Sequence, residues 1–285
     1  MGVRIGVIDV GSNTTRLLVA SAERGGVVVP IDDAKLRLSL GGEIERYGYV
    51  SDVHVRAVAK AVRKMADIAR SQQVASLDVF LTAPGRQAEN SDELVSALSS
   101  AAGVRARVLS KEEEGTLAYR GAVLTTDLTL PARIAVCDVG GASTEIAVGD
   151  PVTGPEWIAS VDLGSVRLTA RAGDHRVEAA ETLRAIEPPA VEAALAVGGS
   201  ARATRRLVGA TLGEAELAEA LALLEQGRPR QIARRYGVDQ ARVEILPAGV
   251  VLLAEVQRKL GVPLHVCDGG IREGAVLASL EALAA

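Results

Sequence analysis

The sequence predicts an α/β protein of two similar lobes with a cleft between them, each lobe a mixed β-sheet flanked by helices. Three observations support this. Apolar runs of strand length alternate with segments whose apolar residues recur at helical spacing, Gly and Pro mark the ends of these segments, and one strand–turn–strand pattern occurs twice. The 285 residues suffice for two modest domains or one large one. Aromatic residues make up only 2%, so Ala, Val, Leu and Ile must build the cores.

The first half of the chain predicts a sheet followed by helices. Val3–Ile8 is expected to form a buried strand, with Leu17–Ala20 as its antiparallel return. Apolar residues at helical spacing predict a helix over Ser51–Ser71, with Ser51 as its N-cap. The other expected strands are Val27–Ile31 with Lys35–Leu40 as its extension, Leu77–Thr82 and Val104–Leu109, and the other helices are Asp92–Ala102 and Glu112–Gly121.

The pattern then restarts. Strands are expected over Ile134–Cys137, Glu145–Val148, Glu156–Val161, Ala194–Val197 and Leu264–Cys267. Helices are expected over Val177–Ile186, Glu214–Glu225, Pro229–Tyr236, Leu246–Leu260 and Glu273–Leu283. This restart divides the chain into lobes of residues 1–121 and 122–285, with the last helix packing near the hinge.

An internal repeat supports the two-lobe interpretation. Arg4–Val19 aligns without a gap on Arg133–Val148, and both copies share the Asp-Val-Gly turn and the Thr that follows it. Two alternating strands can share a period by chance, but they would not also share this turn. We therefore expect a duplication, or a fold with pseudo-twofold lobes.

The chemistry of the repeated turn points to anion binding. Gly takes positive φ readily and lets a ligand approach the backbone, and the N–H groups of such a turn converge on an anion. Hydroxyl and amide side chains add neutral donors, and the Asp that ends each strand, Asp9 or Asp138, suits Mg²⁺. A single turn of this kind is most often an ordinary β-hairpin, but two copies favour phosphate. The two turns comprise Gly11, Ser12, Asn13 and Thr14, and Gly140, Gly141, Ala142 and Ser143.

Two such turns facing each other across a cleft resemble the phosphate loops of the actin-like ATPase superfamily, whose lobes are ribonuclease H-like. Gly198, Gly199 and Ser200, which follow a predicted strand, resemble its third loop, the adenosine loop, although the base here need not be adenine.

One branch of that superfamily matches in more detail. The segments D-V-G-S-N-T-T-R-L-L-V, L-T-A-P-G-R-Q-A-E-N, L-S-K-E-E-E-G-T-L-A-Y-R-G-A, C-D-V-G-G-A-S-T-E-I-A-V-G and D-G-G-I-R-E-G-A-V-L occur in that order. Together they resemble the exopolyphosphatase/guanosine-pentaphosphatase (Ppx/GppA) family over nearly the whole chain. The first motif and the E-E-E helix start are the specific ones.

The resemblance implies a hydrolase that cuts a phosphoanhydride bond with water. By position, Glu114 matches the catalytic glutamate that activates or orients the water, and Arg86 matches an arginine that reaches a substrate phosphate. Asp138 and Glu145 match acidic positions near the metal and water, with Asp9 as a further metal candidate. The implied cofactor is Mg²⁺ or Mn²⁺, with a K⁺ requirement left open. Glu112 and Glu113 are explained as acids that favour a helix N-terminus.

The chain departs from the family pattern at several places. Ala142 stands where a glycine is usual in the second loop, and its methyl group disfavours positive φ. Pro84 and Gly85 replace a helix-compatible pair before Arg86, which predicts a different aim for that side chain. Lys111 stands where Gly is common. We expect any loss of activity to originate at the second loop.

The resemblance leaves the substrate open. Exopolyphosphatase activity on inorganic polyphosphate is the first expectation, and hydrolysis of guanosine pentaphosphate (guanosine-5′-triphosphate-3′-diphosphate, pppGpp) is the second. A weakly active regulator that binds alarmone or polyphosphate is the third. An actin-like kinase is a fourth, which would need a sugar- or acid-binding insert and an adenosine pocket that the sequence does not clearly contain.

Charge and composition argue against other classes. The net charge is −4 and the arginines lie among acids, so nucleic acid is not an expected partner. Two Cys and three His show no metal-binding spacing, and Cys137 and Cys267 are explained as small buried residues at strand ends. Since no apolar run approaches the roughly 20 residues of a membrane span, we expect a cytoplasmic protein, and the family resemblance suggests a homodimer.

Overall fold

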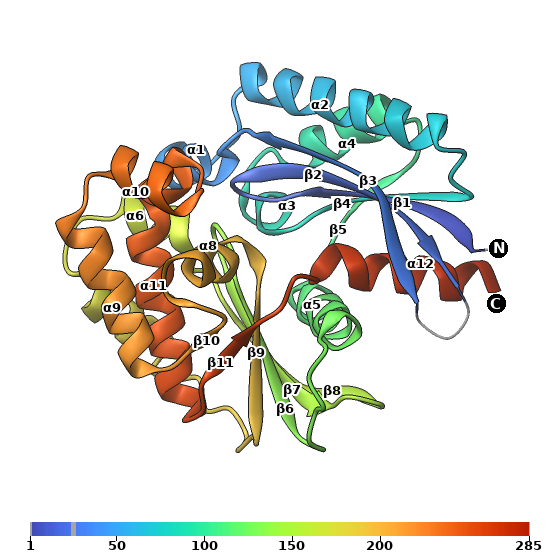
Figure 1. The fold of residues 1–285 in the computed structure, drawn as a ribbon. Coiled ribbons are helices and arrows are strands. Elements are labelled where there is room, and N and C mark those ends of the chain that lie inside the picture. Colours follow the sequence, from blue (N-terminus) through green and yellow to red (C-terminus); the bar gives the residue numbers. More distant parts are fainter. Residues whose placement is uncertain (1, 24–26, 285) are drawn as a thin grey trace. The chain divides into compact units, whose positions relative to one another are not determined.

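The structure, a computed structural model, describes residues 2–23 and 27–284 (Figure 1). The chain divides into two compact units. The first comprises Met1–Leu117 together with Ile271–Ala285, and the second comprises Ala118–Gly270. Each unit contains one mixed β-sheet flanked by helices, which confirms the predicted α/β class.

The first unit is built on a five-stranded sheet in the order β3-β2-β1-β4-β5. Strand β1 pairs antiparallel with β2 and parallel with β4. The strands are β1 (Val3–Val10), β2 (Thr14–Ala22), β3 (Val28–Arg37), β4 (Ser76–Leu81) and β5 (Ala106–Val108).

Helices cover both faces of this first sheet. The apolar sides of α2 (Asp52–Ser71) and α4 (Ser91–Ala102) pack on one face, and α12 (Ile271–Ala284) packs on the other (Figure 1). The predicted N-cap is confirmed, because the Ser51 side chain accepts a hydrogen bond from the backbone N–H of His54. The remaining helices that begin in the first unit are α1 (Leu40–Tyr47), α3 (Ala83–Gln87) and α5 (Lys111–Thr125).

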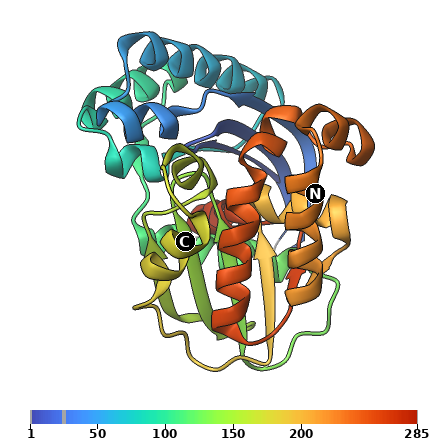
Figure 2. The ribbon, with the colours of Figure 1, turned by 90° about the vertical axis from the view of Figure 1, so that its left-hand side faces the viewer.

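The second unit is built on a six-stranded sheet in the order β10-β11-β9-β6-β7-β8. Its strands are β6 (Ile134–Val139), β7 (Thr144–Asp150), β8 (Gly154–Val161), β9 (Ala193–Val197), β10 (Thr211–Leu212) and β11 (Leu264–Val266). The larger core lies under α6 (Ser165–Ala170), α7 (His175–Leu183), α8 (Gly198–Val208), α9 (Glu214–Gln226), α10 (Pro229–Tyr236) and α11 (Gln240–Leu260). Helices α9 and α11 lie in front of the sheet in Figure 2.

The two sheets share one strand order. Strands β3-β2-β1-β4-β5 of the first correspond in sequence order, neighbours and direction to β8-β7-β6-β9-β11 of the second. The turns also match, because Gly11 N–H donates to the Thr14 carbonyl at 3.1 Å and Gly140 N–H to the Ser143 carbonyl at 3.0 Å. The internal repeat therefore corresponds to a repeated supersecondary structure.

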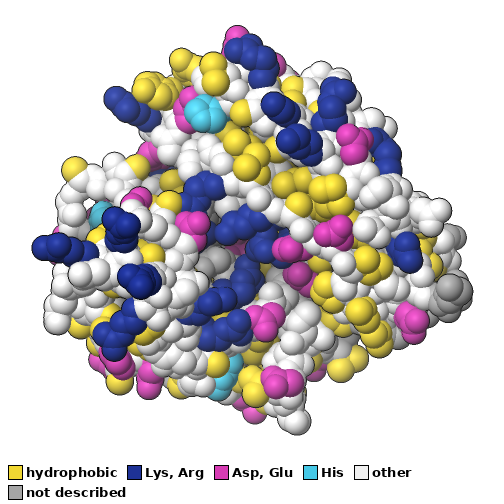
Figure 3. Space-filling view, turned by 45° about the horizontal axis from the view of Figure 1, so that its top comes forward, with side chains coloured by type: hydrophobic (Ala, Val, Ile, Leu, Met, Phe, Trp, Pro, Cys, Tyr) yellow, Lys and Arg dark blue, Asp and Glu magenta, His cyan; other side chains and the backbone are white. Residues whose placement is uncertain are grey.

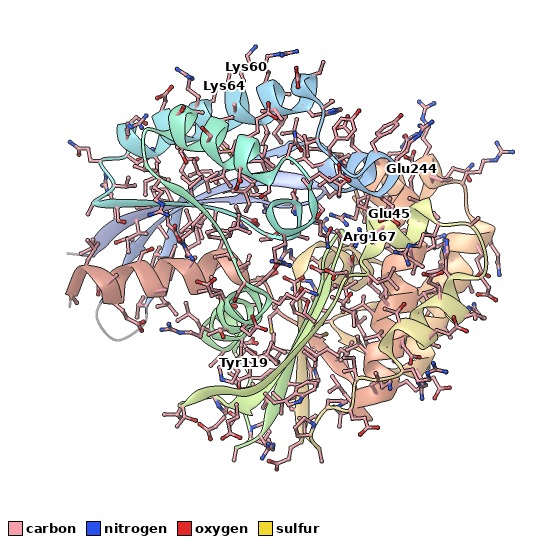
Figure 4. All side chains as sticks on the ribbon, turned by 180° about the vertical axis from the view of Figure 1, so that it is seen from behind. Glu45, Lys60, Lys64, Tyr119, Arg167 and Glu244 are labelled. Atoms are coloured by element: carbon pink, nitrogen blue, oxygen red, sulfur yellow. The ribbon has the colours of Figure 1, made fainter. Side chains whose placement is uncertain are left out.

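The final helix of each half is exchanged. Helix α5 follows β5, but its residues Ala118, Tyr119 and Ala122 pack on the second sheet. Tyr119, labelled in Figure 4, is 1% exposed there. Helix α12 follows β11, but Ala275 and Val276 pack on the first sheet. The compact units therefore differ from the expected lobes 1–121 and 122–285. The reason is that the apolar face of each of these helices packs on the sheet formed by the other half of the sequence.

Four helices were not expected from the sequence. Helices α1, α3, α6 and α8 are short or begin with Gly and Pro, and such residues weaken the helical pattern. Strand β3 ends at Arg37, so Leu40 begins α1 instead of extending the sheet. Helix α11 begins at Gln240, six residues before the expected Leu246, because Asp239 caps it by accepting from Arg242 N–H.

Two smaller expectations concern cysteine and the membrane. Cys137 and Cys267 are free and buried, and burial raises the pKa of both thiols.

Within residues 2–23 and 27–284, no helix is both long and apolar enough to cross a bilayer.

Candidate active site

The first repeated turn joins β1 to β2. Ser12 is 5% and Asn13 8% exposed, and Asn13 Nδ2 is a buried donor without a hydrogen-bond partner in the described part of the chain. Gly11 does not have positive φ, so the expected reason for glycine is wrong there. A Cβ on Gly11 would instead lie 3.3 Å from the Thr14 carbonyl oxygen, so glycine keeps the turn closed. The turn therefore presents a donor that an anion can satisfy.

The segment before α1 holds this turn in place. The backbone N–H groups of Leu38 and Ser39 both donate to the Asn13 carbonyl at 3.2 Å, and Gly41 N–H donates to the Ser12 carbonyl at 2.8 Å. Ser39 has a φ of 52°, and only Gln73 shares that feature among the described non-glycine residues. A non-glycine residue with left-handed backbone is a form of local strain that often occurs at functional sites.

Arg86 and Glu114 form a nearly buried ion pair in the first unit. Arg86 Nη1 lies 2.7 Å from Glu114 Oε2 and also donates to the Leu109 carbonyl at 2.9 Å. Their side chains are 15% and 10% exposed. The Nε and Nη2 atoms of Arg86 are buried and have no hydrogen-bond partner in the described part of the chain. The Nε–Nη2 edge of a guanidinium has the geometry for two hydrogen bonds to one phosphate.

The three glutamates at the start of α5 have different surroundings. Glu113 Oε2 accepts from Ser110 N–H at 2.8 Å, and Ser110 Oγ accepts from Glu113 N–H at 3.0 Å, which is a capping box. Glu112 is exposed, and hydrogen bonds from its own backbone N–H and from Ser110 lower its pKa. Glu114 alone points inward, to Arg86.

A side-chain clamp fixes the segment that carries Arg86. Asn90 Nδ2 donates to the Val50 carbonyl at 2.8 Å, and Asn90 Oδ1 accepts from Val50 N–H at 3.0 Å. Glu89 N–H adds a bond to the Gly48 carbonyl at 2.9 Å. Arg86 lies on α3, where Pro84 occupies the first turn and is compatible with a helix. The unusual Pro84-Gly85 pair therefore does not prevent helix formation at this position.

The second repeated turn joins β6 to β7, and the residues at the start of α6 pack against its backbone. Ser165 N–H and Oγ both donate to the Gly140 carbonyl, at 2.9 and 3.0 Å. A Cβ on Gly164 would lie 2.5 Å from the Gly141 carbonyl carbon, so the backbones touch. Ala142 is 2% exposed, and it is not among the described residues with positive φ. Its methyl group therefore causes no backbone strain.

Asp138 and Glu145 are cross-strand partners in this hairpin, so their side chains lie on the same face. Glu145 is 2% exposed and accepts from Ser160 Oγ at 2.9 Å. Asp138 is more accessible, yet desolvation raises its pKa, and the charges of Arg202 and Arg242 reduce that rise.

The third loop is the N-terminus of α8. Gly198 has a φ of 86°, and a Cβ there would lie 2.2 Å from Asp138 Oδ1. Only glycine fits this position, because both the backbone and the carboxylate exclude a side chain. The Arg242 guanidinium lies over the next residue, since a Cβ on Gly199 would be 2.7 Å from Arg242 Nη2. Ser200 is fully buried, and its Oγ has no hydrogen-bond partner in the described part of the chain.

Comparisons with known proteins identify the family of this chain. The profile of the Ppx/GppA phosphatase family matches residues 18–230. Exopolyphosphatase 1 of Mycobacterium tuberculosis is 30% identical over 98% of this chain and 89% of its own length. The chain belongs to the Ppx/GppA phosphatase family. Exopolyphosphatase 1 of Mycobacterium leprae is 28% identical over 98% of the chain and 90% of that protein.

Solved structures of other proteins share the fold of this Ppx/GppA chain. An exopolyphosphatase-like protein superposes with a TM-score of 0.86 at 22% identity, covering 100% of this chain and 99% of the other. The Aquifex aeolicus Ppx/GppA family member gives a TM-score of 0.82 at 20% identity, covering 98% of each chain. An exopolyphosphatase from Cytophaga hutchinsonii gives 0.85 at 19% identity, also covering 98% of each.

The carboxylates of this Ppx/GppA chain fit a magnesium-type metal only in part. No group of three or more His, Cys, Asp or Glu side chains among residues 2–23 and 27–284 is placed to hold an ion. Asp138 and Glu145 share one face, and Mg²⁺ is commonly bound by one or two carboxylates plus water and substrate phosphates. The pair fits such a site. Asp9, the third candidate ligand, lies in the first unit.

Several residues around these sites were missed by sequence reasoning. They are Ser39, Asn90, Arg202 and Arg242. Arg242 could have been found from the capping signal of Asp239, which moves the start of α11 and places Arg242 in its first turn. The clamp between Asn90 and Val50 gives no local signal, because it joins residues far apart in the chain.

Proposed function

We propose that this Ppx/GppA family member is an exopolyphosphatase, which hydrolyses the terminal phosphoanhydride bond of inorganic polyphosphate. The observation that carries the proposal is the Arg86–Glu114 pair, in which Arg86 Nη1 is held by Glu114 and the Nε–Nη2 edge has no hydrogen-bond partner among residues 2–23 and 27–284. The name Exopolyphosphatase 1 of the mycobacterial relatives supports the choice of substrate.

In the first unit, we assign Arg86 to binding and Glu114 to proton transfer. The Nε–Nη2 edge of Arg86 binds two oxygens of the terminal phosphate, and its charge stabilises the transferring phosphoryl group. Asn13 and the backbone of residues 11–14 add neutral donors. Glu114 orients the attacking water and accepts its proton, while the shortened polyphosphate leaves with the bridging oxygen.

In the second unit, we assign Asp138 and Glu145 to a divalent metal ion, Mg²⁺ or Mn²⁺, that neutralises phosphate oxygens when bound. The turn from Gly140 to Ser143 and the α8 N-terminus from Gly198 to Ser200 supply backbone N–H groups for phosphate. Arg242, beside Gly199, adds a positive charge.

A phosphate-release assay tests this proposal. Medium-chain polyphosphate, guanosine pentaphosphate and ATP are compared side by side, with Mg²⁺ or Mn²⁺ and with or without K⁺. We expect release from polyphosphate that needs a divalent metal and is fastest with this substrate. Faster release from guanosine pentaphosphate would replace the proposal with the nucleotide phosphatase. Tight binding of one substrate without release would indicate a regulator, and an ATP-dependent transfer to a small acceptor would indicate a kinase.

A further inference from the structure

Helix α10 concentrates positive charge in a chain that has more acids than bases. The chain contains 36 Asp and Glu against 32 Lys and Arg, yet residues 226–238 contain four arginines and no acid. The four are Arg228, Arg230, Arg234 and Arg235, and all are exposed. The earlier interpretation that the arginines lie among acids therefore does not hold for this segment.

Three of these arginines lack the acidic partners that some other surface arginines of the second unit have. In the same unit, Arg176 pairs with Glu225 at 3.5 Å and Arg258 with Glu255. Arg228, Arg230 and Arg234, by contrast, form no ion pair or side-chain hydrogen bond in residues 2–23 and 27–284. Like charges four residues apart, as at positions 230 and 234, destabilise a helix. The helix therefore retains unpaired charge at a cost to its own stability.

Contacts with the rest of the second unit hold helix α10 in place. Ile232 is its buried anchor, at 5% exposure, and the Arg235 guanidinium lies 5.2 Å from the centre of the Tyr236 ring. Arg206 Nη1 on α8 donates to the Gly237 carbonyl at 3.3 Å and so fixes the end of α10 against α8. The unpaired arginines therefore lie on a helix that is anchored at Ile232 and at its C-terminal end.

The charge of α10 continues toward Asp138. Arg202 and Arg206 lie one helical turn apart on α8, and Gly198 at its start touches the Asp138 carboxylate. At 1.5 Å per residue, Arg206 lies about 12 Å along the helix from Gly198. Arg242, in the turn of helix that follows α10, lies over Gly199. Arginines thus lead from the third loop, along α8, to α10.

We propose that Arg228, Arg230 and Arg234 bind distal phosphates of a linear polyphosphate chain that also contacts the backbone N–H groups of the third loop. This inference rests on the proposed function and deepens it. A linear polyphosphate carries a negative charge at every unit and suits a row of guanidinium groups, whereas the charge of a nucleotide is confined to a few phosphates. Lys and Arg side chains are exposed on the left of Figure 3, the side on which α10 lies in Figure 1, as well as in its centre and along its top.

The test compares two matched triple variants of the full-length protein. The first, Arg228→Gln/Arg230→Gln/Arg234→Gln, removes three charges from α10. The control, Lys60→Gln/Arg63→Gln/Lys64→Gln, removes three exposed charges from α2, where Lys60 and Lys64 project outward in Figure 4. Binding of fluorescently labelled long-chain polyphosphate is measured by anisotropy at low salt, with tripolyphosphate as an unlabelled competitor. Circular dichroism checks that each variant is folded.

We expect the α10 variant to bind long-chain polyphosphate about tenfold more weakly, since each exposed ionic contact is worth a factor of roughly 1.5 to 5. Its affinity for tripolyphosphate should stay that of the wild type, and the control should bind both as the wild type does. Equal loss for both chain lengths, equal loss in both variants, or no loss would each overturn the inference. A single-stranded RNA oligonucleotide serves as a further probe. The inference would also be overturned if this RNA bound the wild type as tightly as polyphosphate does and lost as much affinity in the α10 variant.

Equilibrium binding separates this inference from the proposed activity. If the wild-type protein releases no phosphate from polyphosphate, the proposed function fails, but the binding difference between the two variants is measured all the same. If the wild-type protein hydrolyses polyphosphate, the KM for the long chain should rise in the α10 variant, with kcat and the KM for tripolyphosphate unchanged.

Discussion

The β1–β2 and β6–β7 hairpins have the same backbone and different chemistry. Their registers match residue for residue, and the same hydrogen bond closes both turns. Across the first sheet, one row at the turn reads Asp9, Arg16, Lys35, and across the second the equivalent row reads Asp138, Glu145, Ser160. The first row contains two cations, and the second contains none.

Under the proposed function, this difference lets a duplicated turn serve two roles. The fold gives both copies the same backbone N–H groups, which suit an anion. The neighbouring strand sets the charge beside the turn, and we propose that Arg16 favours anions there and Glu145 favours cations. The following predictions break or sharpen that comparison, from the largest expected effect to the smallest.

Removal of Arg86 should have the largest effect. Arg86→Ala should lower kcat/KM for polyphosphate by about 10²- to 10³-fold, as loss of one transition-state donor does elsewhere. It should also destabilise the protein by about 3–5 kcal/mol, because Glu114 remains buried without its cation. Arg86→Ala/Glu114→Gln should regain much of that stability and none of the activity. Restored activity in the double variant would contradict the assigned roles. Thermal unfolding measures the change in stability, and phosphate release measures the change in activity.

The charge reversal is tested by neutralising each side. Glu145→Gln should reduce metal affinity, and with it activity at limiting Mg²⁺, by about 10- to 100-fold. Arg16→Gln is the matched change in the first unit, and it should raise the KM for polyphosphate without altering the Mg²⁺ requirement. Mg²⁺ titrations of activity distinguish the two. Full Mg²⁺-dependent activity in Glu145→Gln would refute the division of labour.

The Asn90 clamp should affect Arg86 indirectly. Asn90→Ala leaves both polar groups of the Val50 backbone without their partner, so stability should fall by about 1–3 kcal/mol. If the clamp positions Arg86, the KM for polyphosphate should rise as well. Asn90→Asp keeps the acceptor for Val50 N–H and should be intermediate in both properties. Lost stability with an unchanged KM would make Asn90 purely structural.

Glu43 predicts a pH-dependent contribution from the first unit. Burial raises the pKa of Glu43, but hydrogen bonds from Ser51 and the charge of His54 outweigh it, so the pKa lies below its ordinary value of 4.5. The carboxylate therefore contributes stability that is present above pH 4.5 and is lost as the pH falls through the lowered pKa. Glu43→Gln should cost about 1 kcal/mol at neutral pH, and the difference should vanish in acid. Urea unfolding at several pH values checks the sign.

Ala142 should have the smallest effect. Because its φ is not positive, Ala142→Gly should change activity less than about twofold and destabilise by about 0.4–1 kcal/mol, through the larger freedom of the unfolded chain. A large gain in activity would restore the expectation that Ala142 impairs the second loop.

The sequence predicted what local patterns encode. The repeat predicted matching hairpins, and the family resemblance singled out Glu114, whereas Glu112 and Glu113 were explained as acids at a helix N-terminus. Contacts between segments that are distant in sequence could not be predicted from such patterns. The Asn90–Val50 clamp, the Arg242 contact with Gly199 and the exchange of α5 and α12 depend on packing that no local window contains. The start of α8 was predicted as a loop because two glycines weaken the helical signal.

The placement of α12 has a consequence for synthesis. The second unit, Ala118–Gly270, is continuous, so a growing chain holds all of it before the last helix is made. The first sheet begins at Val3, yet Ala275 and Val276 of α12 cover one of its faces. A nascent chain therefore carries the apolar residues Ile5, Val7 and Phe80 without this cover until α12 has been made. The first unit, whose sheet is made first, completes its core only after the whole second unit has been synthesised.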